Sequence, residues 1–219
     1  MRVLRFWWLP PLLLMVIIAT SICGIALTHY GPADFDAPLL LWFRISGDTG
    51  RLAGPEWTTA FWLGLTWLGD TTPRLVVVGL TIVVLLLRCR WHSTFFIVGV
   101  LLSGVTLSTT IKHWVGRPRP QLVAHLDHVS SQSFPSGHTV NSTLFYLTVA
   151  LMLASLLPQR ATRWIIYMLA ISLSLAIGIS RIALGVHWPS DVLASWVIAC
   201  AWLSLWVVVA RHYWPKAFS

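Results

Sequence analysis

Long apolar runs separated by short polar segments recur along almost the whole of this 219-residue chain. Hydrophobic residues make up 57% of the sequence and charged residues only 10%, whereas charged residues make up about 25% of an ordinary soluble domain. A helix needs roughly 20 apolar residues to cross a bilayer, so a chain of this length has room for about six crossings. The pattern predicts an all-α, polytopic membrane protein with a single membrane-embedded domain, residues 1–219.

Six segments are predicted to be transmembrane helices: residues 9–27, 73–90, 94–111, 138–157, 164–182 and 189–209. The first is predicted as a membrane helix and not a secretory signal, because its apolar run is longer than a signal core and lacks a clean A-x-A cleavage pattern. The second spans only if it begins near Pro73, and proline is well tolerated at a first helical position. Residues 57–68 are short and Trp-rich, which predicts an interfacial helix after the first crossing.

The charges in the connecting loops predict how these helices are oriented. The side that holds both termini carries eight basic residues and no acidic ones: Arg2, Arg5, Arg88, Arg90, Arg160, Arg163, Arg211 and Lys216. By the positive-inside rule, we expect the termini in the cytoplasm and the opposite loops at the periplasmic or outer surface, an asymmetry that suits a bacterial inner membrane. The same bases account for the net charge of +8, so no nucleic-acid partner is expected.

Three polar clusters lie at predicted helix ends on the outer side. The first contains Lys112 and, seven residues later, Arg119. Prolines at positions 118 and 120 stop the helix and hold the arginine in an extended turn, so the two cations can converge on one anion. Arg117 lies off this spacing, and no role at the anion is expected for it.

The second cluster, Pro135-Ser136-Gly137-His138, opens the predicted fourth helix. The unpaired N–H groups of a helix N-terminus form a natural anion-binding site. Ser136 can cap the helix and also donate its hydroxyl, Gly137 lets a ligand approach the backbone, and His138 offers a titratable proton. This cluster is therefore predicted to bind an anion and to move a proton.

The third cluster contains Ser180-Arg181, His187 and Asp191. The four-residue offset between His187 and Asp191 would set the carboxylate beside the imidazole across the first turn of a helix. An acid that holds one ring nitrogen fixes the tautomer and leaves the other nitrogen free to attack. A buried structural charge pair is the alternative, but charges near a bilayer are costly and are usually kept for function.

Together the clusters resemble the type 2 phosphatidic acid phosphatases, whose superfamily also holds bacterial non-specific acid phosphatases and vanadium haloperoxidases. The family pattern is K-x6-RP, then PSGH, then SR-x5-H-x3-D, and every spacing is met between Lys112 and Asp191. The resemblance covers about residues 60–210. It implies the six-helix layout of the membrane-bound branch.

Carried over residue by residue, the resemblance implies a metal-independent hydrolase. His187 would attack phosphorus and form a phosphohistidine, and Asp191 would orient it. His138 would act first as general acid and then as general base. The phosphate oxygens would be held by Lys112, Arg119, Ser136, Gly137 and Arg181.

No metal or other cofactor is expected. The three cysteines show no metal-ligand spacing. His125, Asp127 and His128, in the loop of residues 121–134, lack a companion that would complete a metal site. We expect these three to be ordinary loop residues.

The predicted function is hydrolysis of the terminal phosphate of a membrane lipid phosphate or pyrophosphate. Phosphatidic acid, phosphatidylglycerol phosphate, undecaprenyl pyrophosphate and a lipid A phosphate all fit. A lipid phosphotransferase that uses the same phosphohistidine stays open. A vanadium haloperoxidase is disfavoured because that branch resembles large soluble proteins. A non-enzymatic lipid-binding or transport protein is disfavoured because none of the fixed residues of the family pattern is missing from this sequence.

Overall fold

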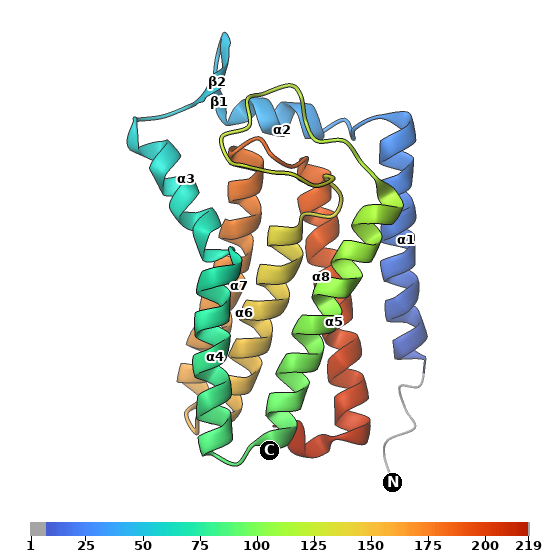
Figure 1. Cartoon of the computed structure of the whole chain (residues 1–219), viewed down its shortest axis with the longest axis vertical. Coiled ribbons are helices and arrows are strands. Elements are labelled where there is room, and N and C mark those ends of the chain that lie inside the picture. The colour runs from blue at the N-terminus through green and yellow to red at the C-terminus, as the bar shows by residue number, and fades with distance from the viewer. Residues whose placement is uncertain (1–7, 219) are drawn as a thin grey trace.

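A bundle of long helices running in the same general direction dominates the structure (Figure 1). The computed structural model describes residues 8–218. The long helices are α1 (Leu9–Tyr30), α4 (Thr71–Leu87), α5 (Trp91–Val115), α6 (Gly137–Ser155), α7 (Arg160–Ala183) and α8 (Pro189–Tyr213). The predicted helical membrane protein is thus confirmed, with a helix at each of the six predicted positions.

The predicted count of six crossings is not confirmed. Within residues 8–218, four helices (α1, α5, α7 and α8) are long and apolar enough to span a membrane. The short helix α3 (Trp57–Leu68) passes the same test together with α4, across a bend of 44° at their junction. Helix α6 does not pass, because its first turns carry His138, Asn141 and several hydroxyl side chains.

The connection between α1 and α3 contains a short helix and a hairpin that the sequence did not predict. It forms α2 (Asp36–Trp42) and a hairpin of β1 (Arg44–Ile45) and β2 (Asp48–Leu52). The Arg44 guanidinium anchors the hairpin by donating to the carbonyl of Ala183 at 2.6 Å and to that of Thr49 at 3.1 Å. The strands could not be predicted because they are short and four of the five β2 residues are exposed. They therefore show no alternation of apolar and polar residues.

Helix α6 lies inside the bundle, packed against α5, α7 and α8. Its buried side chains, among them Leu144 and Phe145, join Phe96 and Val100 of α5 in one apolar core. On the other side, α7 approaches α8 closely at Gly178, where an added Cβ would lie 2.5 Å from the Trp196 ring. This packing holds the first turn of α6 between the end of α7 and the start of α8.

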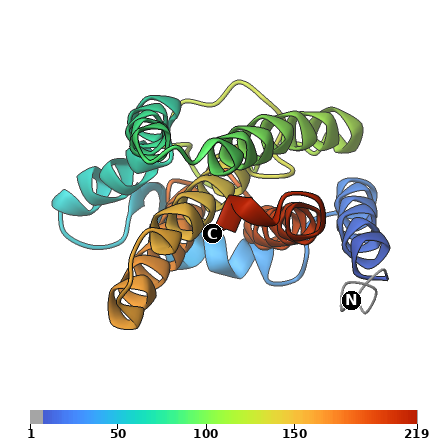
Figure 2. The ribbon, with the colours of Figure 1, turned by 90° about the horizontal axis from the view of Figure 1, so that it is seen from below.

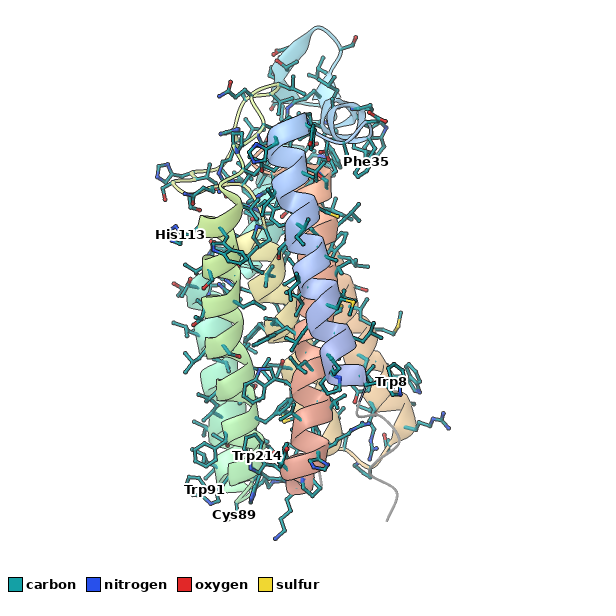
Figure 3. All side chains as sticks on the ribbon, turned by 90° about the vertical axis from the view of Figure 1, so that its right-hand side faces the viewer. Trp8, Phe35, Cys89, Trp91, His113 and Trp214 are labelled. Carbon is teal, nitrogen blue, oxygen red and sulfur yellow. The ribbon has the colours of Figure 1, made fainter. Side chains whose placement is uncertain are left out.

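The two ends of the bundle differ in what they carry. The α4–α5 and α6–α7 connections, the start of α1 and the C-terminal 3-10 helix η2 (Pro215–Phe218) lie at one end (Figures 1 and 2). Exposed Trp8, Trp91 and Trp214 lie toward this end (Figure 3), as expected of side chains that favour a membrane–water interface. Helix α2, the hairpin and the three polar clusters lie at the opposite end.

Candidate active site

The three polar clusters come together where α5 ends, α6 begins and α7 turns into α8. The loop of residues 116–136 folds across this end of the bundle (Figure 1). It is fastened by hydrogen bonds from the Ser133 amide to the Arg117 carbonyl at 2.8 Å and from the Leu126 amide to the Leu184 carbonyl at 3.0 Å. The loop thereby brings the first two clusters onto the third.

His187 lies in the turn between α7 and α8, with only 2% of its side chain exposed. A guanidinium nitrogen of Arg119, Nη1, lies 3.2 Å from His187 Nε2. Because a guanidinium can only donate hydrogen bonds, this contact requires Nε2 to be the unprotonated nitrogen. The proton of the neutral ring therefore sits on Nδ1, and the lone pair of Nε2 faces the cations.

Asp191 lies beside the other ring nitrogen, as the four-residue spacing predicted. Its Oδ2 is 3.6 Å from His187 Nδ1. The Ser133 hydroxyl bridges the two groups, donating to Oδ2 at 2.5 Å and lying 3.4 Å from Nδ1. Sequence analysis missed Ser133, because it precedes the PSGH motif and no spacing rule marks it.

Arg117 is the ion-pair partner of Asp191, a contact that the sequence did not predict. Its Nη1 donates to Asp191 Oδ1 at 2.6 Å, and its Nη2 donates to Asp36 Oδ2 at 3.1 Å. Asp36 belongs to α2 and also accepts from the amide and the hydroxyl of Ser190, at 2.8 and 2.6 Å. Arg117 is 2% exposed and both carboxylates are fully buried, so a single guanidinium is shared between two buried carboxylates. Because buried charges are usually paired, a cationic partner for Asp191 could have been expected from the sequence. The sequence does not indicate which cation it is.

The surroundings of His187 keep its ring neutral. Burial, followed by the charges of Arg119, Arg181 and Lys112, lowers the pKa of His187 well below its ordinary value. At neutral pH the ring is therefore unprotonated and can act as a nucleophile. Burial and the charge of Arg181 also lower the pKa of Arg119, to about 10, which still leaves that guanidinium charged at pH 7.

The three predicted phosphate-binding cations are held around His187 by hydrogen bonds to two backbone carbonyls of connecting segments and to a hydroxyl of α3. Lys112 Nζ donates to the Gln132 carbonyl at 2.7 Å, and Arg119 Nη1 donates to the Val186 carbonyl at 2.5 Å. Arg181 Nη1 donates to Thr66 Oγ1 at 2.5 Å. The Nε of Arg181 is buried and has no hydrogen-bond partner among residues 8–218.

Asp127 is not an ordinary loop residue, which corrects the expectation for it. Its Oδ2 accepts a hydrogen bond from Arg181 Nη1 at 2.5 Å. Burial raises the pKa of Asp127, but the hydrogen bond and charge of Arg181 outweigh it, so the pKa is lower than usual. In the same loop, His125 Nε2 lies 2.7 Å from the Pro120 carbonyl oxygen. Arg181 thus already holds one carboxylate oxygen at the site.

The PSGH residues form the N-terminus of α6. Ser136 caps the helix, with its Oγ accepting from Thr139 N at 3.4 Å and from Thr139 Oγ1 at 2.9 Å. Nothing lies within 4 Å of a Cβ built on Gly137, so its backbone is open to a ligand. His138 Nε2 lies 2.7 Å from Asp70 Oδ1, a partner that sequence analysis did not assign.

The arrangement is suited to transfer of a tetrahedral anion. A buried, neutral imidazole, a second and partly exposed imidazole, and several cations surround the start of a helix, where developing negative charge is stabilised. Within residues 8–218, no group of three or more His, Cys, Asp or Glu side chains has the arrangement of a metal site. The positive charge of the site comes from its Lys and Arg side chains.

Comparison with known proteins identifies the family. The model of the PAP2 superfamily matches residues 93–215, which include all three clusters. This chain belongs to the PAP2 superfamily. The predicted membership in the phosphatidic acid phosphatase family is confirmed, and helices α5 to α8 carry the PAP2 region.

Curated relatives of this PAP2 chain are phosphatases by name. Phosphatidylglycerophosphatase B of Bacillus subtilis (strain 168) is 33% identical over 141 residues, 63% of this chain and 68% of that protein. Lipid A 1-phosphatase of Rhizobium johnstonii is 30% identical over 54% of this chain and 48% of that protein. Undecaprenyl-diphosphatase BcrC of Bacillus subtilis is 33% identical over 45% of this chain and 48% of that protein.

Solved PAP2 structures share the fold. A transmembrane PAP2 type phosphatidylglycerolphosphate phosphatase from Bacillus subtilis superposes with a TM-score of 0.71, at 24% identity over 93% of this chain and 96% of that one. Aquifex aeolicus LpxE superposes with a TM-score of 0.59, at 18% identity over 83% and 97% of the two chains. At these identities the likeness establishes the common architecture of the helical bundle.

Proposed function

We propose that this protein is an integral membrane lipid phosphatase that removes the terminal phosphate of a lipid phosphate or pyrophosphate. The observation that carries the proposal is a buried, neutral imidazole, His187, that faces Arg119 and lies in the field of Lys112 and Arg181. The relatives whose names refer to lipid phosphates support the substrate class.

In the first step, Nε2 of His187 attacks phosphorus as the bond between phosphorus and the lipid oxygen breaks. His138, protonated, gives its proton to the departing oxygen, and a phosphohistidine forms. The ring of His187 becomes cationic, and the adjacent carboxylate of Asp191 stabilises that charge. The hydroxyl of Ser133 keeps the carboxylate beside Nδ1.

In the second step, water attacks the phosphohistidine. His138, now neutral, takes a proton from the water as the bond between phosphorus and His187 Nε2 breaks, and inorganic phosphate leaves. The side chain of His138 is 30% exposed, so water can reach it.

The phosphate oxygens are held through both steps by fixed positive groups. We assign this role to three cations, a helix cap and a backbone amide: Lys112, Arg119, Arg181, Ser136 and Gly137. Arg181 is expected to exchange the carboxylate of Asp127 for a phosphate oxygen. Such preorganised groups supply most of the rate acceleration in phosphoryl transfer.

The charge distribution supports an orientation for the site. The α4–α5 and α6–α7 connections carry basic residues at the end of the bundle opposite the site. We propose that this basic end faces the cytoplasm of a bacterial inner membrane and that the site faces the periplasm or exterior. A lipid in the outer leaflet could then present its phosphate while its tails stay in hydrocarbon.

The proposed function predicts phosphate release from a membrane lipid. We expect the purified protein in detergent to release phosphate from at least one of phosphatidic acid, phosphatidylglycerol phosphate, undecaprenyl pyrophosphate and a lipid A phosphate. Inorganic phosphate would be measured with each lipid at equal surface concentration. A folded wild-type protein inactive on the whole panel would rule out this function.

The catalytic groups named here also predict how the enzyme responds to a chelator and to vanadate. Because the charge that stabilises the transition state comes from side chains, an excess of EDTA is expected to leave phosphate release unchanged. Orthovanadate is expected to inhibit, since it adopts the trigonal-bipyramidal geometry of the transferred group. Strict dependence of the rate on added Mg²⁺ would contradict the mechanism.

A further inference from the structure

Asp70 occupies the break between α3 and α4 and turns its side chain toward the site. It is the N-cap residue of α4, and Asp is among the side chains that cap helices best. Nevertheless its carboxylate makes no capping hydrogen bond. Oδ1 lies instead 2.7 Å from Nε2 of His138, on a different helix.

The chain around Asp70 is built to hold this contact. Helix α3 ends with hydrogen bonds from the Gly69 amide to the Thr66 carbonyl and from the Asp70 amide to the Trp67 carbonyl, at 2.8 and 2.9 Å. The Tyr146 hydroxyl of α6 donates to the Leu68 carbonyl at 3.0 Å.

Gly69 allows the break to lie close to its neighbours. A Cβ at this position would lie 2.7 Å from Cγ2 of Ile177 on α7 and 3.4 Å from Cδ2 of His138. The 44° bend between α3 and α4 therefore places Asp70 against the start of α6. The absence of a side chain at position 69 permits the close approach.

We propose that Asp70 is a positioning residue for the proton-transfer step, forming a dyad with His138 in which the carboxylate accepts Nε2–H and directs Nδ1 toward the phosphate. The proposal rests on the proposed function. As general acid, the imidazolium keeps Nε2–H on Asp70 while Nδ1–H protonates the departing lipid oxygen. As general base, the neutral ring keeps the same Nε2–H and uses the Nδ1 lone pair to accept a proton from water.

Several charged groups besides Asp70 act on the His138 ring. Arg181 of α7 and Arg74 of α4 disfavour a protonated ring, and Asp127 of the 116–136 loop favours it. Among these groups, Asp70 alone hydrogen bonds to the ring. Removing its charge disfavours the imidazolium, so the general acid loses its proton at a lower pH.

The dyad is tested with Asp70→Asn, which keeps the shape of the side chain and removes its charge. On phosphatidic acid, we expect kcat to fall by tenfold or more and the basic limb of the pH–kcat profile to move to lower pH. On p-nitrophenyl phosphate, whose leaving group needs no acid, we expect less than a threefold loss in the rate of the pre-steady-state burst of p-nitrophenol, which reports the first step alone. Asp34→Asn, an exposed acid on the same end of the bundle, is the matched control and should behave as wild type.

Two further variants separate positioning from a merely structural role. In a His138→Ala background, adding Asp70→Asn is expected to cause no further loss on phosphatidic acid, because the group it positions is gone. Asp70→Glu keeps the carboxylate and is expected to keep the basic limb of the wild type. If Asp70→Asn does not fold, the Asp70→Glu profile still tests the dyad.

Either of two results would overturn the dyad: an equal loss on both substrates with an unmoved pH profile, or a further loss in the His138→Ala background. A displaced basic limb in Asp70→Glu would do the same. These outcomes are distinct from failure of the proposed function, which would appear as a wild-type protein inactive on every lipid phosphate.

Discussion

His187→Ala is expected to lower the rate of phosphate release by at least about 10⁴-fold while leaving the protein folded. The substitution removes the only group proposed to bond to phosphorus, so no phosphohistidine can form. Folding is expected to survive because the ring is neutral and its neighbours keep other hydrogen bonds. Arg119 still bonds to the Val186 carbonyl, and Ser133 still bonds to Asp191. Turnover on the preferred lipid and elution from size-exclusion chromatography measure the two effects.

Two histidine variants serve as comparisons for this result. His138→Ala should be nearly as damaging on a lipid, a poor leaving group, and much less damaging for the first step on p-nitrophenyl phosphate. His113→Ala changes an exposed histidine one residue from Lys112 and should leave the rate unchanged (Figure 3). Full activity in a folded His187→Ala protein would refute covalent catalysis at this position.

Arg117→Met is expected to destabilise the protein by about 3–5 kcal/mol, the range for removing one partner of a buried ion pair. The carboxylates of Asp36 and Asp191 would both stay buried without their cation. We expect activity to fall as well, because Asp191 would lose its ion-pair partner and be held beside His187 only by its hydrogen bonds from Ser133 and the Trp188 amide. A thermal or denaturant unfolding transition in detergent, together with turnover, measures this prediction.

The nature of the arginine contacts also predicts the effect of a conservative change. Arg117→Lys keeps the charge but cannot contact both carboxylates with the fixed fork of a guanidinium, so an intermediate loss of stability is expected. Arg51→Met, at an exposed position of the hairpin, is the control and should change stability by less than about 0.5 kcal/mol. A stable and fully active Arg117→Met protein would show that the buried ion pairs have no such role.

The helices could be predicted because the bilayer imposes a length and a composition on each crossing. Residues 57–68 were expected to be helical and form α3 over the same bounds. The count of crossings could not be predicted in the same way. Near the site, helix α6 carries His138, Asn141 and hydroxyl side chains in place of the apolar side chains of a membrane span. Helix α3 is long enough to span only together with α4.

The adjacency of His187 and Asp191 could be predicted because it depends on the local geometry of one helical turn. The partners that complete the site come from distant segments and carry no spacing signal. Asp70 bonds to a residue 68 positions away, and Arg117 bonds to one 74 positions away. Such pairs depend on how α3, α2 and the 116–136 loop close over the bundle. Sequence periodicity does not encode that closure.

The charge distribution explains why so many partners were missed. To orient the chain, sequence analysis used the acidic residues only through their absence from the side of the termini, and, Asp191 apart, it assigned no partner to those on the site side. In the fold, Asp36, Asp70 and Asp127 each bond to a cation or an imidazole at the site. Charged side chains near a bilayer are costly, and they are usually paired with another group.

The most direct test of this account is the identification of the phosphorylated atom. The His138→Ala variant would be mixed with p-nitrophenyl phosphate and quenched under conditions that preserve N–P bonds, because loss of the general base slows hydrolysis of the intermediate. Mass spectrometry of the peptides is predicted to find phosphate on the ring of His187, released by acid, and none after His187→Ala. Phosphate on another residue, or turnover without any phosphorylated His187, would contradict the central claim.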